Sequence, residues 1–119
     1  MSTVKFENWF QASFGVKVPR GYLEFIAKNP NSVYNGRGGS LWDVQYAMSE
    51  TDVREMAEKG VCVIGGGDSL THYLLRAKDG RVFVVDRLDY SVVDAWFSSI
   101  DDMLALMGFD PKNRSYPAP

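Results

Sequence analysis

The side chains that most often carry catalysis are scarce in this chain of 119 residues, which has one histidine and one cysteine. A zinc site needs three or four His, Cys or carboxylate ligands, usually at short motif spacing. His72 and Cys62 offer no such set, and Cys62 lies in the apolar run 61–64, which is typical of a small core residue. We therefore expect no metal, no other cofactor and no cysteine nucleophile.

Two glycine clusters are the next candidates, because glycine-rich loops can bind phosphate groups. A P-loop needs Gly-x-x-x-x-Gly-Lys-Ser/Thr, which occurs nowhere in the sequence. The dinucleotide-binding pattern needs a third glycine at the position of Leu70, so the cluster at 65–67 does not match it. We interpret 65–67 as a turn or bulge between strands, and 36–39 as a flexible loop.

Carboxylates gather toward the C-terminus, and pairs of carboxylates can hydrolyse glycosides. They are Asp86, Asp89, Asp94, Asp101 and Asp102. Some clustering is expected among fifteen acidic residues, and Asp101 and Asp102 also suit the positive end of a helix dipole. The cluster therefore favours a solvated acidic rim, or a surface that meets a basic partner, over an acid-dependent hydrolase. No feature of the sequence favours an enzyme.

The helical spacing of apolar residues predicts two helices before residue 30. The first ends at Gly15 and has the apolar stripe Phe6, Trp9, Phe10 and Phe14. The second begins near Pro19, which a first helical turn tolerates, and ends at 29–30. Its buried face should consist of Tyr22, Phe25 and Ile26.

The middle of the chain predicts a loop at 29–40 and then a strand at 41–47, where apolar and polar residues alternate. Ser49 begins a capping box for a third helix, which Gly60 ends. The buried residues of that helix should be Val53, Met56 and Ala57. A last helix begins at Ser98 or Ser99 and ends at Gly108, with the apolar stripe Ile100, Met103, Leu104 and Met107.

Asp79-Gly80 separates two strand-like runs and predicts a hairpin with a two-residue type I′ turn. That turn pairs Leu75 with Val84 and Tyr73 with Asp86. One hairpin face is then a core face, made of Tyr73, Leu75, Ala77, Val82 and Val84. The other face mixes apolar and cationic residues, as a binding surface can: Leu74, Phe83 and Val85 with His72, Arg76 and Arg87. The runs 61–64, 72–77 and 81–87 should form one antiparallel sheet.

Helices before and after a hairpin-connected sheet predict an α+β domain. We expect an antiparallel sheet of about four to six strands with helices packed on one face. A hydrophobic content of 45% is ordinary for a globular domain. Residues 1–110 should form a single domain, and 111–119, which contain three prolines, a C-terminal tail.

The composition argues against several classes of function. A net charge of −2 is unlike the basic field of a dedicated nucleic-acid-binding protein. No apolar run approaches the ~20 residues that span a bilayer, and the first residues lack the pattern of a secretory signal. A single cysteine suits a reducing compartment. We expect a soluble, cytoplasmic domain that binds neither nucleic acid nor membrane.

Several segments, taken in order, resemble the SUKH superfamily. Residues 18–26 are similar to its Leu-Pro-x-x-Tyr-x-x-Phe-Leu helix, and an Asn-Gly-Gly-type loop follows at 35–39. The hairpin is similar to Tyr-x-Leu…Asp-Gly-x-Val-Tyr…Asp through Tyr73, Asp79-Gly80 and Asp86. Residues 96–104 are similar to the Ser-Phe-x-x-Phe-Leu start of a terminal helix. Val18, Arg37 and Met103-Leu104 depart from the usual pattern.

The resemblance implies an immunity protein, because most bacterial members of this superfamily bind and neutralise a cognate polymorphic toxin. The toxin is often a nuclease or deaminase domain, and the family shares no catalytic residues. It also implies a mechanism of occlusion, in which a preformed surface covers the toxin's active site. The alternative is a regulatory or scaffolding module that binds an endogenous protein, like the fungal cell-wall-synthesis regulators of the same superfamily.

Aromatic anchors inside a charged rim dominate the energetics of protein interfaces. We therefore expect partner-binding residues among the aromatic and acidic side chains Trp42, Asp86, Asp89, Tyr90, Asp94 and Trp96. Core packing is the competing interpretation for Trp42 and Trp96, since large aromatic side chains bury well. A basic toxin domain is the partner that the acidic residues favour.

Overall fold

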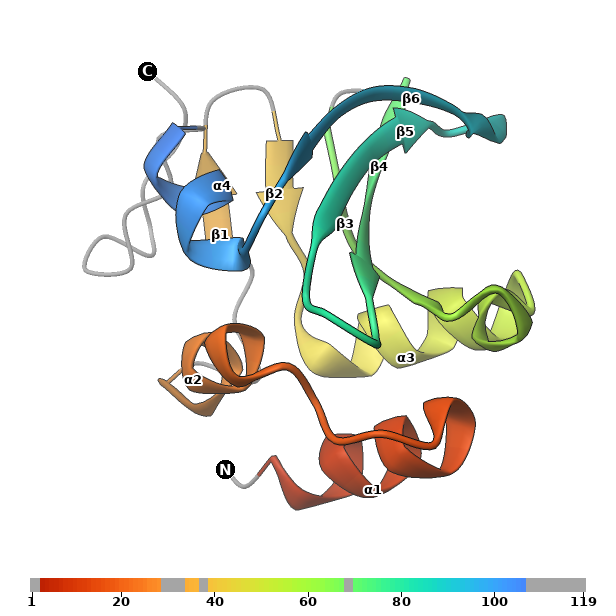
Figure 1. The fold of residues 1–119 in the computed structure, drawn as a ribbon, viewed down its shortest axis with the longest axis vertical. Helices are drawn as coiled ribbons and strands as arrows, with labels where there is room; N and C mark the ends of the chain where they lie inside the picture. Colours follow the sequence, from red (N-terminus) through yellow and green to blue (C-terminus); the bar gives the residue numbers. More distant parts are fainter. Residues whose placement is uncertain (1–2, 29–33, 37–38, 68–69, 107–119) are drawn as a thin grey trace.

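The computed structural model describes residues 3–28, 34–36, 39–67 and 70–106. The predicted tail at 111–119 and the loop positions 37–38 lie outside these residues. In chain order the elements are α1 (Val4–Phe14), α2 (Arg20–Lys28), β1 (Tyr34–Gly36), β2 (Gly39–Leu41), α3 (Val44–Val53), the short 3₁₀ helix η1 (Met56–Lys59), β3 (Val61–Gly66), β4 (Thr71–Arg76), β5 (Val82–Asp86), β6 (Asp89–Phe97) and α4 (Ile100–Leu106) (Figure 1).

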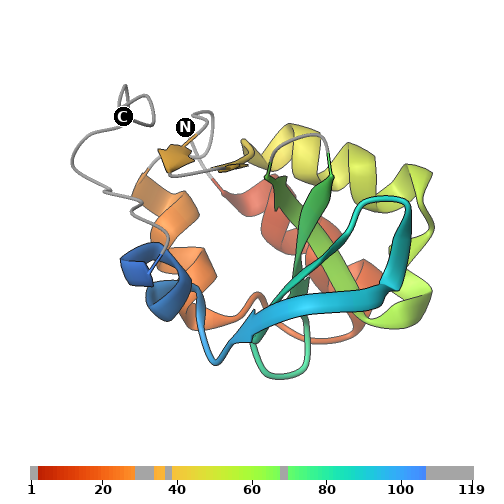
Figure 2. The ribbon, with the colours of Figure 1, turned by 90° about the horizontal axis from the view of Figure 1, so that it is seen from above.

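The strands that the structure describes form one six-stranded antiparallel sheet, in the order β1-β2-β3-β4-β5-β6. Each strand pairs with the next one in the chain, so β1 and β6 are the two edges. Figure 2 shows β6 running along one side of the sheet. The predicted fold class is confirmed: an α+β domain with an antiparallel sheet. In the described ranges, no helix is long and apolar enough to cross a membrane.

The main core lies between one face of the sheet and the helices. The predicted stripes of the first two helices and of the last one contribute to it, and so does the predicted core face of the hairpin. Its buried residues include Phe6, Phe10, Tyr22, Ile26, Tyr73, Leu75, Val82, Ile100 and Met103. Full burial of one such side chain contributes roughly 1.5–3 kcal/mol, so this cluster is the main source of stability.

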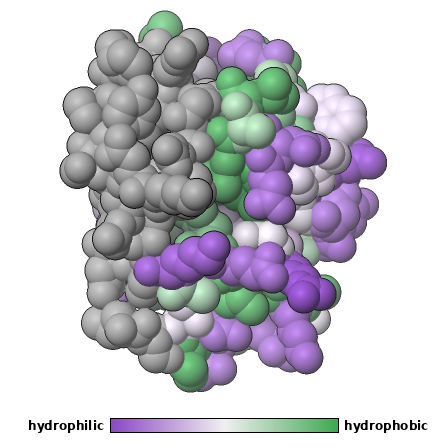
Figure 3. All heavy atoms as spheres, turned by 90° about the vertical axis from the view of Figure 1, so that its left-hand side faces the viewer, coloured by the Kyte–Doolittle hydropathy of each residue, from purple (hydrophilic) through white to green (hydrophobic). Residues whose placement is uncertain are grey.

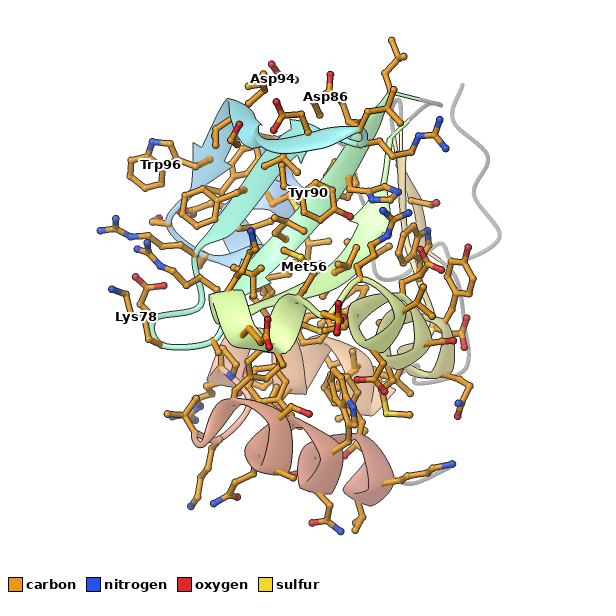
Figure 4. All side chains as sticks on the ribbon, turned by 90° about the vertical axis from the view of Figure 1, so that its right-hand side faces the viewer. Met56, Lys78, Asp86, Tyr90, Asp94 and Trp96 are labelled. Carbon is orange, nitrogen blue, oxygen red and sulfur yellow. The ribbon has the colours of Figure 1, made fainter. Side chains whose placement is uncertain are left out.

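The opposite face of the sheet carries a second, smaller cluster. Met56 of η1 packs there against Val63, Leu74 and Val85. Figure 4 looks onto this face and shows Tyr90 above Met56. At its margin, the guanidinium of Arg76 stacks over the half-buried ring of Phe83, with 5.1 Å between the Arg76 Cζ and the ring centroid. The predicted mixture of apolar and cationic residues on this face is confirmed.

The hairpin is antiparallel, as predicted, but its register differs from the predicted one by two residues. Tyr73 pairs with Val84, and Leu75 pairs with Val82. A type I′ turn needs positive φ at both central residues, and of Asp79 and Gly80 only Gly80 has it, at 79°. The Asp79 carboxylate instead accepts hydrogen bonds from Arg76 Nη2 at 2.6 Å and from Arg81 N at 3.1 Å. A two-residue shift leaves each side chain on its predicted face.

The structure of residues 34–60 corrects the predictions for the loop, the strand and the helix start in this part of the chain, and for the burial of Val53. The predicted loop at 29–40 contains β1 and most of β2, and the predicted strand at 41–47 stops at Leu41. The helix α3 begins at Val44 because Asp43 caps it, its Oδ2 accepting a hydrogen bond from Tyr46 N at 3.4 Å. Ser49 therefore lies inside α3, and Val53 is exposed, not buried.

Gly15 and Ser99 cap helices as predicted, but the predicted third helix does not run unbroken to Gly60: α3 ends at Val53, and Glu55, with a left-handed φ of 55°, separates it from η1. Gly15 ends α1 with a left-handed φ of 73°, and Gly60 ends η1 with a φ of 74°. At the start of α4, Ser99 Oγ accepts a hydrogen bond from Asp102 N at 3.2 Å, which is the predicted N-cap. The predicted end of this helix, Gly108, lies outside the described residues.

Candidate functional site

The residues predicted to bind a partner fall into two regions of the structure. Trp42 and Tyr90 lie on the sheet face that carries Met56. Asp86 and Asp94 lie at the top of the sheet in Figure 4, and Trp96 projects outward at its side. The fold therefore separates the predicted set into a half-buried aromatic pair, Trp42 and Tyr90, and a second group at the end of β5 and along β6.

Trp42 and Tyr90 both contact His72, whose side chain is largely buried. His72 Nδ1 lies 2.6 Å from the Tyr90 hydroxyl, which donates to it when the imidazole carries its proton on Nε2. The Trp42 ring meets the imidazole edge-on, with 5.3 Å between ring centroids. Burial lowers the pKa of His72, and the nearby Arg54 lowers it further. The imidazole is thus a neutral, packed hydrogen-bonding group.

Trp42 and Tyr90 each have a further neighbour on this face. The Tyr46 ring lies edge-on to Trp42, at 4.7 Å between centroids, and the Arg54 guanidinium lies over Tyr90, at 5.8 Å from its centroid. Burial raises the pKa of the Tyr90 hydroxyl, which therefore stays protonated near neutral pH. Trp42 and Tyr90 therefore contact both the sheet residue His72 and side chains of α3 and its C-cap.

Asp86 and Asp89 shape the turn between β5 and β6. Asp86 Oδ1 accepts hydrogen bonds from Leu88 N at 2.7 Å and from Asp89 N at 3.2 Å. Asp89 Oδ1 accepts from Ser91 N at 3.0 Å and from the Ser91 hydroxyl at 2.6 Å, and these bonds lower the pKa of Asp89. The lowered pKa keeps Asp89 charged near neutral pH, and the hydrogen bonds of both carboxylates fix the start of β6.

The exposed part of the second group is centred on residues 92–96 of β6, which we call the β6 edge. Val92, Val93 and Trp96 are 47%, 50% and 54% exposed, and Asp94 and Ala95 are exposed as well. The Arg81 guanidinium covers part of Trp96, with 4.9 Å between the Arg81 Cζ and the ring centroid. Trp96 therefore has the exposure that a partner-binding aromatic residue requires.

Val92 and Val93 were not among the predicted binding residues. The run 88–97 lacks a clear period, because register shifts in the β5–β6 pairing occur between Val84 and Val85 and between Val85 and Asp86. The first shift adds one β6 residue, Asp94, and the second adds residues 90–92, which changes which side chains face outward. The sequence signal that could have indicated them is an apolar pair next to an aspartate, in a segment between the hairpin and the last helix.

The groups with reactive chemistry lie away from this surface. Burial raises the pKa of the Cys62 thiol to about 12, so the thiol is not ionised near neutral pH. Its sulfur lies 3.6 Å from the Thr51 hydroxyl in the core. In the part of the chain that the structure describes, no three His, Cys, Asp or Glu side chains lie close enough to hold a metal ion.

The fold and the site define an α+β domain in which β6 is, among the described residues, an edge strand with exposed apolar and acidic side chains. No protein-family model matches the chain, and no curated protein matches it. The SUKH assignment therefore stays a prediction from the sequence.

Proposed function

We propose that this chain is a non-catalytic immunity protein, which binds a cognate bacterial toxin in the cytoplasm and blocks the toxin's active site. The observation that carries the proposal is the β6 edge, where Val92, Val93 and Trp96 are about half exposed beside Asp94. Exposed apolar side chains next to charged ones are typical of a surface that a protein partner covers. The ordered SUKH-like segments favour a toxin as this partner.

Charge favours a basic toxin domain, such as a nuclease. Among the described residues, no lysine or arginine forms an ion pair with Asp86, Asp89 or Asp94. Unpaired carboxylates on one side of a protein attract a basic surface and raise its rate of association. Occlusion also needs no reacting group, which agrees with a protonated Cys62 and a packed His72.

A co-expression assay tests this function. Each gene that neighbours the gene of this chain is expressed alone in a laboratory bacterium, and then together with this chain. We expect one neighbouring product to arrest growth and this chain to restore it, whereas an unrelated domain of similar size should not. The purified toxin domain and this chain should also elute as one complex.

Two results would contradict the proposal: no neighbouring product is toxic, or its toxicity persists when this chain is present. Stable co-purification with an endogenous housekeeping protein, without relief of any toxicity, would favour the regulatory or scaffolding module instead.

A further inference from the structure

Among the described residues, no strand pairs with the outer side of the edge strand β6. It is nine residues long, it is the last strand in the sheet order, and residues 91–96 are all exposed. The outer side of an edge strand presents N–H and C=O groups that can hydrogen-bond to a strand of another chain. β6 is therefore a template for strand addition.

The usual protections of an edge strand are weak at the C-terminal half of β6. Natural edges are blunted by short length, lysine, proline or bulges. β6 contains neither lysine nor proline, and the irregularities in its pairing lie opposite residues 84–86. From Ala95 to Phe97 the pairing is regular, with Phe83 opposite Trp96 and Val82 opposite Phe97. This part of β6 therefore lacks the bulge that would blunt the edge.

A groove continues the β6 edge where the strand meets α4. Its volume is about 520 Å³, and it is lined by Trp96, Phe97, Ser98, Asp102, Ala105 and Leu106. Leu106 is 75% exposed, and Ser98 Oγ hydrogen-bonds to the Asp102 carboxylate. Figure 3 shows hydrophobic surface among hydrophilic side chains on the side of the molecule where α4 lies. A strand placed along β6 would bring a side chain to this groove, whose apolar walls suit a bulky apolar residue.

Charge distinguishes a basic partner from a second copy of this chain. Among the described residues, Asp89, Asp94 and Asp102 form no ion pair with a lysine or arginine. A dimer formed through β6 would gather Asp89 and Asp94 of both copies in two adjacent strands, and like charges that face each other destabilise such a pair. Lysine or arginine on an incoming strand would instead be attracted to these carboxylates.

We propose that the partner binds by strand addition: an extended segment with lysine or arginine opposite Asp94, and a bulky apolar residue for the groove, pairs with the free side of β6. This inference rests on the proposed function for the identity of the partner, a toxin. It rests on the geometry of β6 and α4 for the mode of binding.

A phage library of random ten-residue peptides tests the edge without knowledge of the toxin. We expect the selected peptides to be enriched in lysine, arginine and bulky apolar residues. Asp94→Lys and Trp96→Ala should each weaken their binding about tenfold or more, because truncating or reversing an interface anchor typically has such an effect. Glu58→Lys makes the same charge reversal on an exposed position of η1, and Tyr46→Ala truncates an exposed aromatic residue on α3; both controls should bind normally.

Three results would overturn strand addition: no enriched peptide, enrichment without a basic bias, or binding that neither Asp94→Lys nor Trp96→Ala weakens in variants with unchanged thermal melts. A dimer in sedimentation that Trp96→Ala dissociates would also overturn it, since a second copy would then occupy the edge.

If the β6 variants relieve toxicity as well as the wild type does, strand addition fails while the immunity function stands. If the library is enriched as expected and no neighbouring toxin is neutralised, the immunity function fails and the edge remains a peptide-binding site.

Discussion

At the scale of single residues, the environment of His72 links the sheet face to pH. Burial, with a smaller contribution from Arg54, places the folded-state pKa of His72 below its usual value of 6.5. As the pH falls through 6.5, the unfolded chain therefore binds a proton before the folded chain does. The free energy of unfolding therefore decreases as the pH falls from 6.5 to the lower, folded-state pKa, and it stays reduced below that pKa. Well above pH 6.5 this histidine has no effect on stability.

We predict that the free energy of unfolding of the wild type falls more between pH 7.5 and pH 5.5 than that of His72→Asn. Asparagine retains a polar group that can reach the Tyr90 hydroxyl, but it does not titrate. Urea unfolding at the two pH values measures the difference. Equal losses in the two proteins would show that His72 does not titrate differently in the folded and unfolded states.

Thr51 is a second residue whose role is visible only in the fold. Its hydroxyl donates to the Ala47 carbonyl oxygen at 2.7 Å and accepts from Val63 N at 2.9 Å, and Thr51 is fully buried. β2 pairs with β3 only at Gly65 and Gly66, so the hydroxyl supplies Val63 N–H with the partner that no neighbouring strand provides.

We predict that Thr51→Val destabilises the protein by roughly 1–3 kcal/mol, because Val63 N–H is then buried without an acceptor. Thr51→Ser retains the hydroxyl and should lose clearly less. Chemical denaturation of the three proteins measures the difference. A valine variant as stable as the wild type would mean that Val63 N–H finds another acceptor.

At the scale of the elements, the glycine cluster in β3 holds two strands close together. The turn or bulge predicted at 65–67 is displaced: the register shift lies between Val63 and Gly65, and Gly65 and Gly66 themselves pair with β4. A side chain at Gly65 would collide with the Ser40 carbonyl oxygen and lie 3.1 Å from the Leu41 Cα atom. Close approach of backbone, not a phosphate group, therefore explains glycine at this position.

We predict that Gly65→Ala costs on the order of 1–3 kcal/mol, as overpacking of a tight contact does, and that it loosens β2 before the rest of the sheet. Thermal unfolding measures the first effect, and faster amide exchange in β2 measures the second. An unchanged melt together with unchanged exchange in β2 would refute this account of the glycine.

The helices with long apolar stripes were predictable from sequence, because periodicity over three turns leaves little choice of buried face. The segment at 41–47 was not, since Trp42, Val44 and Tyr46 satisfy a strand pattern over so short a run. The deciding contact is a cap: Asp43 binds the backbone of Tyr46 and starts α3. In the hairpin, Asp79 uses its carboxylate to bind Arg76, and the turn becomes longer than the dipeptide suggests.

The candidate site was predictable only in part. The acidic and aromatic character of 86–96 is visible in the sequence, and the exposure of Asp94 and Trp96 agrees with it. The contact of Trp42, His72 and Tyr90 depends on the register of strands far apart in the chain. No local pattern specifies that register, so the half-buried state of Trp42 and Tyr90 had to come from the structure.

At the scale of the whole molecule, the two sides of the sheet differ in what they leave for a partner. The helices α1, α2 and α4 contribute to the main core on one face, and Met56 of η1 fills part of the other. The meander then ends in β6, whose outer side has no neighbour among the described elements. Recognition through this strand agrees with a domain in which two described reactive groups, Cys62 and His72, are buried and packed.

Hydrogen exchange of the backbone amides, with and without the toxin domain from the co-expression assay, tests this account most directly. If a toxin segment adds to the sheet, the outward-facing amides of β6 become protected in the complex, because they gain hydrogen-bond acceptors. The amides near Trp42 and His72 should exchange at the same rate in both states. Protection confined to the face of Trp42 and His72, with β6 exchanging as fast as in the free protein, would contradict binding through β6.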